Sequence, residues 1–268
     1  MRVEAFGQSQ QGLARAENQD SVGLDHARRL FVVSDGMGGH AEGARASREV
    51  VAAMLAPRDL TLTRPISDLA RLKQQVHDSH QRVLAVAREL GHEGDMGATL
   101  VVLWLNGENY RLAAVGDSRI YLWREGRLLQ LNEDHTLARH YLRTGVLNQE
   151  EAANHPQRHV LTQAMGVGQV EPDLFEGAAR PGDRFLLCSD GVHGVLPEGE
   201  ITALLGKAPS AKVAVEALLA RVRQLAGGDD ATALVAEVGQ VAEPETKPEP
   251  QEPPKSQGGL KATRLRKV

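Results

Sequence analysis

The chain has 268 residues, 41% of them hydrophobic, which is enough for one large domain or two small ones with a buried core. Its formal net charge of -4 offers no basic surface of the kind that nucleic-acid binding requires, so we expect no nucleic-acid partner. The single cysteine, Cys188, excludes an intramolecular disulfide and is typical of a reducing compartment. The first residues lack the apolar segment of a secretory signal, and the longest apolar run, Ala98–Leu105, is far shorter than the ~20 residues of a membrane span. We therefore expect a soluble, cytoplasmic protein with no membrane partner.

Short apolar or alternating runs predict strands along the first 240 residues. They fall at Arg2–Phe6, Ser21–Leu24, Leu30–Ser34, Ala98–Leu105, Tyr110–Val115, Arg119–Trp123, Arg127–Leu131, Arg184–Ser189 and Ala231–Val238. Helical spacing of apolar residues predicts helices at 42–55, 66–90, 198–205 and 211–225. Asn106-Gly107 and Glu125-Gly126 separate consecutive strands as hairpin turns do. Strands joined by short turns form antiparallel sheets whose faces the helices must cover, so we expect an α+β sandwich.

The composition changes abruptly after about Gly239. Residues 241–268 are rich in Pro, Glu and Lys and contain no aromatic residue, so they cannot bury enough apolar surface to offset the entropy of ordering. We expect a domain at 1–240 followed by a disordered tail at 241–268. The basic end of the tail is interpreted as a solvated terminus, with a docking segment for a partner as the alternative.

The tripeptide Ser-Asp-Gly occurs twice, each time at the end of an apolar run. The two runs are LFVVSDGMGGH, which contains Asp35, and RFLLCSDGV, which contains Asp190. Each pattern predicts a buried strand that delivers a carboxylate to the edge of a sheet. The glycine that follows lets the chain turn at once and leaves its backbone carbonyl open to a ligand. Two such strand ends could meet around hard cations.

The glycines after Asp35 also fit the loose dinucleotide-binding pattern G-x-G-x-x-[G/A]. Asp35 stands immediately before this stretch, however, where its carboxylate would repel a pyrophosphate. The downstream segments are predicted to form hairpins and not βαβ units, and the sequence contains no G-x-x-x-x-G-K-[ST] motif. These observations argue against a nucleotide-binding fold.

Three further acids, Asp20, Asp117 and Asp229, lie next to Gly, Ser or another acid at the edges of predicted strands. A single acid commonly occupies a turn, but five clustered carboxylates cannot all stay ionised in a dry pocket without cations. Sites built from oxygen ligands favour Mg²⁺ or Mn²⁺, and a pair of such ions is suited to in-line phosphoryl displacement. Arg15, shortly before Asp20, offers a planar fork that matches phosphate oxygens.

In order along the chain, the segments RAENQD, SDGMGGH, MGATL, GDSRIY, CSDGV and GGDDAT resemble the signature blocks of the metal-dependent PPM phosphatases. These are the type 2C protein serine/threonine phosphatases, and the likeness is to the compact bacterial members. It extends from about Ala5 to Glu237. The resemblance implies a four-layer α/β/β/α sandwich with two central antiparallel β-sheets and a site for two Mn²⁺ or Mg²⁺ ions at one end of the sheets. It also implies hydrolysis of phosphoserine and phosphothreonine on proteins by a hydroxide that bridges the metals.

The resemblance assigns roles to individual residues. Asp35 is expected to bridge the metal pair, and the Gly36 carbonyl is expected to contribute beside it. The other ligands of the pair would be Asp20, Asp190 and Asp229. Asp117, together with Asp190, matches the residues that hold a third, weaker ion in bacterial relatives, and Arg15 matches the arginine that binds the substrate phosphate. The segment from about Asp134 to Gly166 corresponds to a flap beside the cleft that is thought to influence substrate choice.

The sequence departs from the family pattern at three positions. Gln19 stands where many relatives have Glu, and Asp230 replaces the usual Asn, which adds negative charge that is expected to act on the metals. Met37 stands where eukaryotic members carry a histidine taken as the general acid, so the acid is left unassigned. We consider His40 a candidate for a supporting proton donor.

Four histidines of the flap are predicted to be surface or flap-packing residues: His135, His140, His155 and His159. His77 and His80 are spaced for one helix face but have no acidic partner segment, which argues against a zinc site there. Cys188 is predicted to be a packing residue.

The main hypothesis is thus a monomeric bacterial phosphatase that acts on phosphorylated proteins, among them a Hanks-type Ser/Thr kinase and its targets. One alternative is a catalytically weak scaffold or binding protein with a phosphatase fold. Against it, every acid expected to hold the metal pair is present. Another is a phosphatase of a phosphoprotein that regulates a sigma factor.

Overall fold

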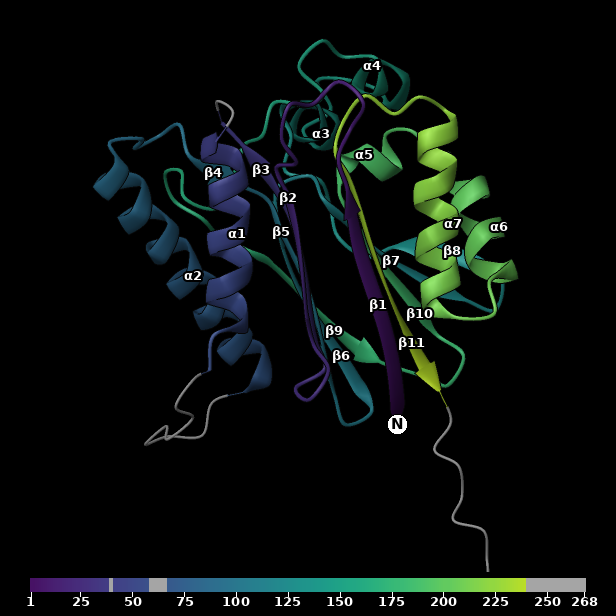
Figure 1. Cartoon of the computed structure of the whole chain (residues 1–268). Helices are drawn as coiled ribbons and strands as arrows, with labels where there is room; N and C mark the ends of the chain where they lie inside the picture. Colours follow the sequence, from purple (N-terminus) through teal and green to yellow (C-terminus); the bar gives the residue numbers. More distant parts are fainter. Residues whose placement is uncertain (39–40, 58–66, 240–268) are drawn as a thin grey trace, which may run out of the picture.

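The computed structural model describes residues 1–38, 41–57 and 67–239. Two antiparallel sheets pack face to face at its centre (Figure 1). One sheet has the strand order β1-β11-β10-β7-β8, formed by β1 (Arg2–Gln10), β11 (Ala231–Gly239), β10 (Arg184–Cys188), β7 (Arg119–Arg124) and β8 (Arg127–Gln130). The other has the order β2-β3-β5-β6-β9, formed by β2 (Asp20–Asp25), β3 (Leu30–Met37), β5 (Leu100–Asn106), β6 (Asn109–Val115) and β9 (Asp173–Ala178), and the short β4 (Gly97–Ala98) pairs with β3.

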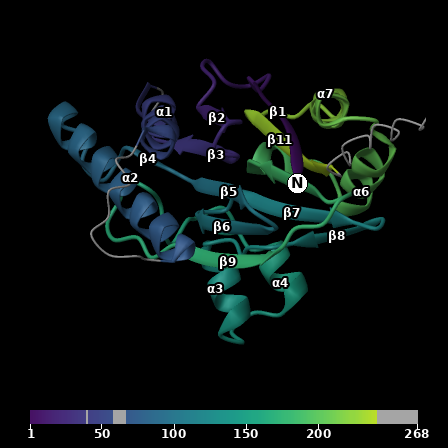
Figure 2. The same ribbon diagram turned by 90° about the horizontal axis from the view of Figure 1, so that it is seen from below.

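Helices cover the outer face of each sheet. Helices α1 (Ala41–Leu55) and α2 (Asp68–Leu90) lie on the sheet that contains β3, and α6 (Glu198–Lys207) and α7 (Ala211–Gln224) lie on the other (Figures 1 and 2). The shorter helices lie at one end of the sheets: α3 (Leu137–Arg143), α4 (Gln149–Ala153) and α5 (Asp190–His193).

Alternation along the central strands explains the layers. In β3, Val32 packs under α1 and α2, while Phe31 and Val33 face the second sheet. In β10, Leu186 and Cys188 pack under α6 and α7, and their neighbours in the strand face the first sheet. The apolar residues thus form three clusters, one between the sheets and one beneath each helical layer. The four-layer α+β sandwich is confirmed, and Cys188 is a packing residue, as predicted.

The prediction of a single strand at Ala98–Leu105 is wrong in one respect. The structure divides this segment at Thr99 into β4 and β5. Thr99 donates its backbone N–H to the Asp35 carbonyl (2.8 Å), and its hydroxyl accepts the Asp35 N–H (2.9 Å). The interruption therefore lies opposite Asp35 and fixes the backbone that carries this carboxylate.

Four elements were not predicted: β9, α3, α4 and α5. Strand β9 is a sheet edge with half of its residues exposed, so its sequence, DLFEGA, carries no strong apolar signal. Helix α5 is a single turn that begins at Asp190. His40 and the predicted tail, 241–268, lie outside the described residues. None of the helices in the described ranges combines the length and apolar content that a membrane span requires.

Candidate metal and phosphate site

The five predicted aspartates meet at one end of the two sheets. Asp20 begins β2 and is paired in register with Asp35 near the end of β3, so their side chains lie on the same face. Asp190 is the first residue of α5, and the other two occupy loops, Asp117 after β6 and Asp229 before β11. Burial raises the pKa of Asp35 well above its ordinary value, and the charges of four neighbours add to this rise: Asp20, Asp190, Asp117 and Asp229. The fold therefore brings the five carboxylates together, and their roles as metal ligands stay predictions.

This cluster fits divalent cations. Asp20 is 7% exposed, and one of its oxygens, Oδ1, is buried without a hydrogen-bond partner among the described residues. Burial raises the pKa of Asp20 to about 7, and repulsion from Asp190 adds to the rise. A buried carboxylate without a partner is unfavourable, and a cation provides the missing partner. Because the donors are carboxylate oxygens, Mg²⁺ and Mn²⁺ are the ions that suit them.

Ser189, the serine of the second Ser-Asp-Gly, positions Asp20. Its hydroxyl donates to Asp20 Oδ2 (2.7 Å) and accepts the backbone N–H of Thr232 (3.0 Å). One side chain thus joins β2, the end of β10 and the start of β11. The sequence analysis predicted a role for the acid of this tripeptide but not for the serine, because the contact joins segments far apart in the chain.

We expect Ser189→Ala to lower the free energy of unfolding by about 1–3 kcal/mol, because the Thr232 N–H loses its buried acceptor. Mn²⁺ affinity is expected to fall as well, because Asp20 loses the group that orients it. Urea denaturation and calorimetric Mn²⁺ titration measure the two effects. Thr202→Ala is a suitable control, since its hydroxyl bonds only a carbonyl on the exposed part of α6. A Ser189→Ala protein with unchanged stability and unchanged Mn²⁺ affinity would contradict this role.

Asp230 has a structural role in addition to the expected effect of its charge. Its two carboxylate oxygens accept the backbone N–H groups of Gly12 (2.9 Å) and Gln19 (2.8 Å), and the residue is 2% exposed. Its charge adds to the rise in the pKa of Asp20, but its direct contacts fix the loop that carries Arg15. An Asn in the same orientation would place its NH2 group, which is a donor, opposite one of these two N–H groups.

Arg15 extends over Asp229 at the mouth of the site. Its Nε donates to Asp229 Oδ1 (2.6 Å), and Nη2 lies 2.5 Å from the same oxygen. Both side chains are about 40% exposed, at 42% and 41%. The predicted phosphate-binding arginine is therefore held by a predicted metal ligand at a solvent-accessible position.

Gly36 allows the end of β3 to approach α1 closely. Its N–H donates to the Gln19 carbonyl (3.1 Å), and a Cβ added at this position would lie 2.0 Å from the carbonyl oxygen of Gly43. The contact requires glycine on steric grounds. The predicted role of the Gly36 carbonyl as a metal ligand stays a prediction.

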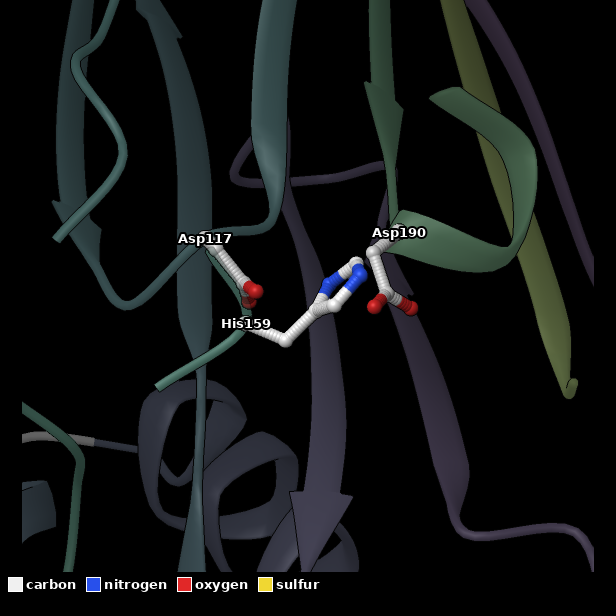
Figure 3. Close-up of side chains that lie close together, drawn as sticks. All are labelled: Asp117, His159 and Asp190. Carbon is white, nitrogen blue, oxygen red and sulfur yellow. The ribbon is translucent and has the colours of Figure 1, made fainter. Parts of the chain in front are cut away.

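His159 was predicted to be a surface or flap-packing residue, and this prediction was incomplete. The side chain is exposed, but its imidazole lies between the carboxyl groups of Asp117 and Asp190 (Figure 3). One ligand atom of each residue lies within 4.8 Å of those of the other two. His135, in contrast, is a packing residue as predicted, because it is 9% exposed and its Nδ1 accepts the Gly116 N–H (3.3 Å).

The predicted flap holds α3 and α4, which lie at the same end of the molecule as the carboxylates, on the side of β8 and β9 (Figures 1 and 2). Arg119, from the GDSRIY segment, binds Asp134 at the start of the flap through Nε (2.9 Å) and Nη2 (2.7 Å). A cavity of about 840 Å³ is lined by residues of both the flap and the body. It is bounded by Asp117, Asp190 and His159, and also by Arg139, Arg158 and Phe175.

The raised pKa values predict how Mn²⁺ binding depends on pH. Burial raises the pKa of Asp20 and that of Asp117 to about 7, from an ordinary value of 3.8. A cation binds the deprotonated groups, so it must displace protons below about pH 7. We expect Mn²⁺ to raise the melting temperature more at about pH 8 than at about pH 6.

Without metal, the contribution of Asp20 and Asp117 to the stability of the folded protein should decrease, and not increase, as the pH rises. Since their folded pKa is raised, the folded protein binds more protons than the unfolded chain between about pH 4 and pH 7, and their contribution to stability falls as the pH rises through this window. His193 acts in the other direction below about pH 6.5, because burial lowers its pKa to about 4. This opposing effect is common to both forms, so the comparison with and without Mn²⁺ removes it. A Mn²⁺-induced shift in melting temperature that is independent of pH would contradict the prediction.

Comparison with known proteins shows what this arrangement resembles. The sequence profile of the family described as protein phosphatase 2C matches residues 12–237. The serine/threonine protein phosphatase PstP of Mycobacterium tuberculosis is 38% identical over 232 residues, a match that covers 86% of this chain and 44% of that protein. The serine/threonine phosphatase stp of Listeria welshimeri is 32% identical over 241 residues, which covers 88% of this chain and 96% of that protein. The chain therefore spans less than half of the mycobacterial relative and nearly all of the Listeria one.

The fold gives the same result. The solved catalytic domain of PstP in complex with 2 manganese ions has a TM-score of 0.77 and 34% sequence identity to this chain, over 89% of this chain and 99% of that one. The resemblance stated from the signature blocks is thus confirmed over most of the chain by both sequence and structure. The chain belongs to the protein phosphatase 2C family.

Proposed function

We propose that this chain hydrolyses phosphoserine and phosphothreonine on proteins with the help of two Mn²⁺ or Mg²⁺ ions. The observation that carries the proposal is that four aspartates, each from a separate segment, lie around the buried carboxyl of Asp35. Relatives named as serine/threonine phosphatases support it, as does the solved relative that holds two manganese ions.

In this proposal the metal pair is held by Asp35, the Gly36 carbonyl and three further carboxylates: Asp20, Asp190 and Asp229. When bound, the two cations supply positive charge for the phosphoryl oxygens and lower the pKa of water. The carboxylates fix where these charges lie, and Asp35 and Asp190 are close enough for a hydrogen bond between their side chains when one is protonated. The crowding of negative charge that destabilises the metal-free site is what holds the cations.

Arg15 is proposed to orient the phosphate. Its guanidinium is half-exposed above Asp229, so a phosphate at the mouth of the site can reach it. A planar fork of N–H groups binds two phosphate oxygens at once and fixes the orientation of the phosphoryl group. The loop that carries Arg15 is held by the buried Asp230 carboxylate, which limits how far the arginine moves.

The leaving serine or threonine oxygen needs a proton as its bond to phosphorus breaks. His40 remains our candidate for a supporting donor. His193, on α5, is a poor candidate, because burial lowers its pKa to about 4 and its Nε2 donates to the Asp117 carbonyl (3.0 Å). At neutral pH this imidazole carries no proton beyond the one already used in that bond.

The substrates are proposed to be phosphorylated proteins, among them a bacterial Hanks-type kinase and its targets, with the chain acting as a cytoplasmic monomer. The cavity beside the flap supports a polypeptide substrate, since Arg158 and Phe175 line it together with Asp117 and Asp190. Phosphoproteomics of a deletion strain tests the partner. Phosphothreonine should accumulate on a kinase and its targets, and an unchanged profile would count against this partner.

The activity is tested with the purified full chain and three matched peptides that carry phosphothreonine, phosphoserine or phosphotyrosine. We expect phosphate release from the first two in Mn²⁺, loss of release in EDTA, and recovery when Mn²⁺ is restored. Failure to release phosphate from any of them in Mn²⁺ or Mg²⁺, by a folded protein, would refute the proposed function and favour a binding role.

A further inference from the structure

His159 lies where the flap returns to the body of the molecule. Two backbone hydrogen bonds close the base of the flap beside it, from Leu137 N–H to the Val160 carbonyl (2.9 Å) and from Thr162 N–H to the His135 carbonyl (2.8 Å). These bonds fix the position of the arm that carries His159. The imidazole can therefore lie between Asp117 and Asp190, which belong to the body (Figure 3).

The Asp117 carboxylate is suited to a ligand role. The residue is 8% exposed, and among the described residues no other residue donates a hydrogen bond to this carboxylate. Its backbone is held in place, because His193 Nε2 donates to the Asp117 carbonyl (3.0 Å). A fixed and nearly buried carboxylate therefore faces Asp190 and an imidazole, with one ligand atom of each within 4.8 Å of the others.

We propose that the imidazole of His159 is a ligand of the third, weaker cation, and that this ion ties the flap to the body. The family resemblance implies only Asp117 and Asp190 for that ion, and the nitrogen donor from the flap is the new element. The inference rests on the proposed function for the existence of a metal centre. It requires no change in the assignment of the metal pair.

The chemistry of the donors predicts a difference in selectivity between the sites. Imidazole nitrogen suits transition metals, whereas Mg²⁺ prefers oxygen donors and keeps much of its water. The third site should therefore bind Co²⁺ or Mn²⁺ in preference to Mg²⁺, and Co²⁺ more tightly than Mn²⁺. The sites of the metal pair are built from oxygen donors and should discriminate less than the third site between these ions and Mg²⁺.

Binding at this site has a consequence for substrates. Arg158 directly precedes His159, and both residues line the cavity of about 840 Å³ that the flap shares with the body. An ion that joins His159 to Asp117 and Asp190 restrains this arm of the flap. It thereby limits the positions of Arg158 and the width of the cavity beside the carboxylates.

The test uses Co²⁺ and the purified full chain, with His159→Ala and the matched control His140→Ala, which removes an exposed imidazole from α3 of the same flap. Equilibrium dialysis counts the bound ions, and visible absorption reports the nitrogen ligand. We expect the third Co²⁺ to bind His159→Ala at least about tenfold more weakly than the wild type, with loss of the absorption that accompanies its binding. Co²⁺ should also slow proteolysis within the flap of the wild type and of His140→Ala, but not of His159→Ala.

The outcomes separate this inference from the proposed function. A His159→Ala protein that binds a third Co²⁺ with wild-type affinity and spectrum overturns the inference. So does a wild-type chain that binds only two ions, while the metal pair and the proposed function stand. A wild-type chain that binds no divalent cation refutes both.

Discussion

Replacement of Asp35 by Asn should lower kcat/KM for a phosphothreonine peptide in Mn²⁺ by at least about a thousandfold, which corresponds to about 4 kcal/mol of transition-state stabilisation. Asp35 is buried, and four other carboxylates influence its pKa, so it lies at the centre of the negative charge that would hold the cations. An amide has almost the same shape but no charge. The expected loss is therefore one of cation binding and not of packing.

The same substitution should lower activity but should not lower stability when no metal is present. In EDTA, Asp35→Asn should be at least as stable as the wild type, because it removes a buried carboxyl group whose ionised form is unfavourable beside four other carboxylates. Addition of Mn²⁺ should raise the melting temperature of the wild type but hardly that of the variant. Glu216→Gln is a suitable control, since it removes a charge from the exposed face of α7 and should change neither property. Near-normal turnover by a folded Asp35→Asn protein would contradict the assignment of Asp35 as a ligand of the metal pair.

The sequence predicted the carboxylates of the site because each has a local signature. Asp35 and Asp190 end apolar runs that form central strands, β3 and β10, and such strands are recognisable from their apolar residues alone. Once antiparallel pairing brings Asp20 opposite Asp35, the two carboxylates must share a face. These features follow from strand periodicity and need little knowledge of the tertiary structure.

The residues that the sequence did not reveal depend on contacts between distant segments. Nothing near His159 in the sequence shows that the flap folds back so that the imidazole meets Asp117. Asp230 was interpreted by its charge, but its role depends on N–H groups of Gly12 and Gln19, which the fold brings to it from the other end of the chain. Supporting residues of this kind need the three-dimensional arrangement to be identified.

Replacement of Gly36 by Ala should destabilise the protein by about 1–3 kcal/mol and should also reduce activity. The added Cβ would lie 2.0 Å from the Gly43 carbonyl oxygen and 2.4 Å from its carbonyl carbon. These are backbone atoms, so no side-chain rotation relieves the contact, and the end of β3 must move away from α1. The φ of Gly36 is not positive, so the expected effect is steric and does not arise from backbone strain.

The movement at Gly36 would displace its neighbour Asp35, and an error of about 1 Å in the position of a catalytic group can reduce the rate by about a hundredfold. Urea denaturation and kcat/KM as a function of Mn²⁺ concentration measure the two effects. Gly199→Ala provides the matched control, because nothing lies within 4 Å of an added Cβ there and α6 should gain about 0.5–1 kcal/mol from the helix propensity of Ala. If Gly36→Ala is as stable and as active as the wild type, β3 and α1 are not packed as closely as described. If it is destabilised but needs no more Mn²⁺ for half-maximal activity, the position of Asp35 does not depend on this contact.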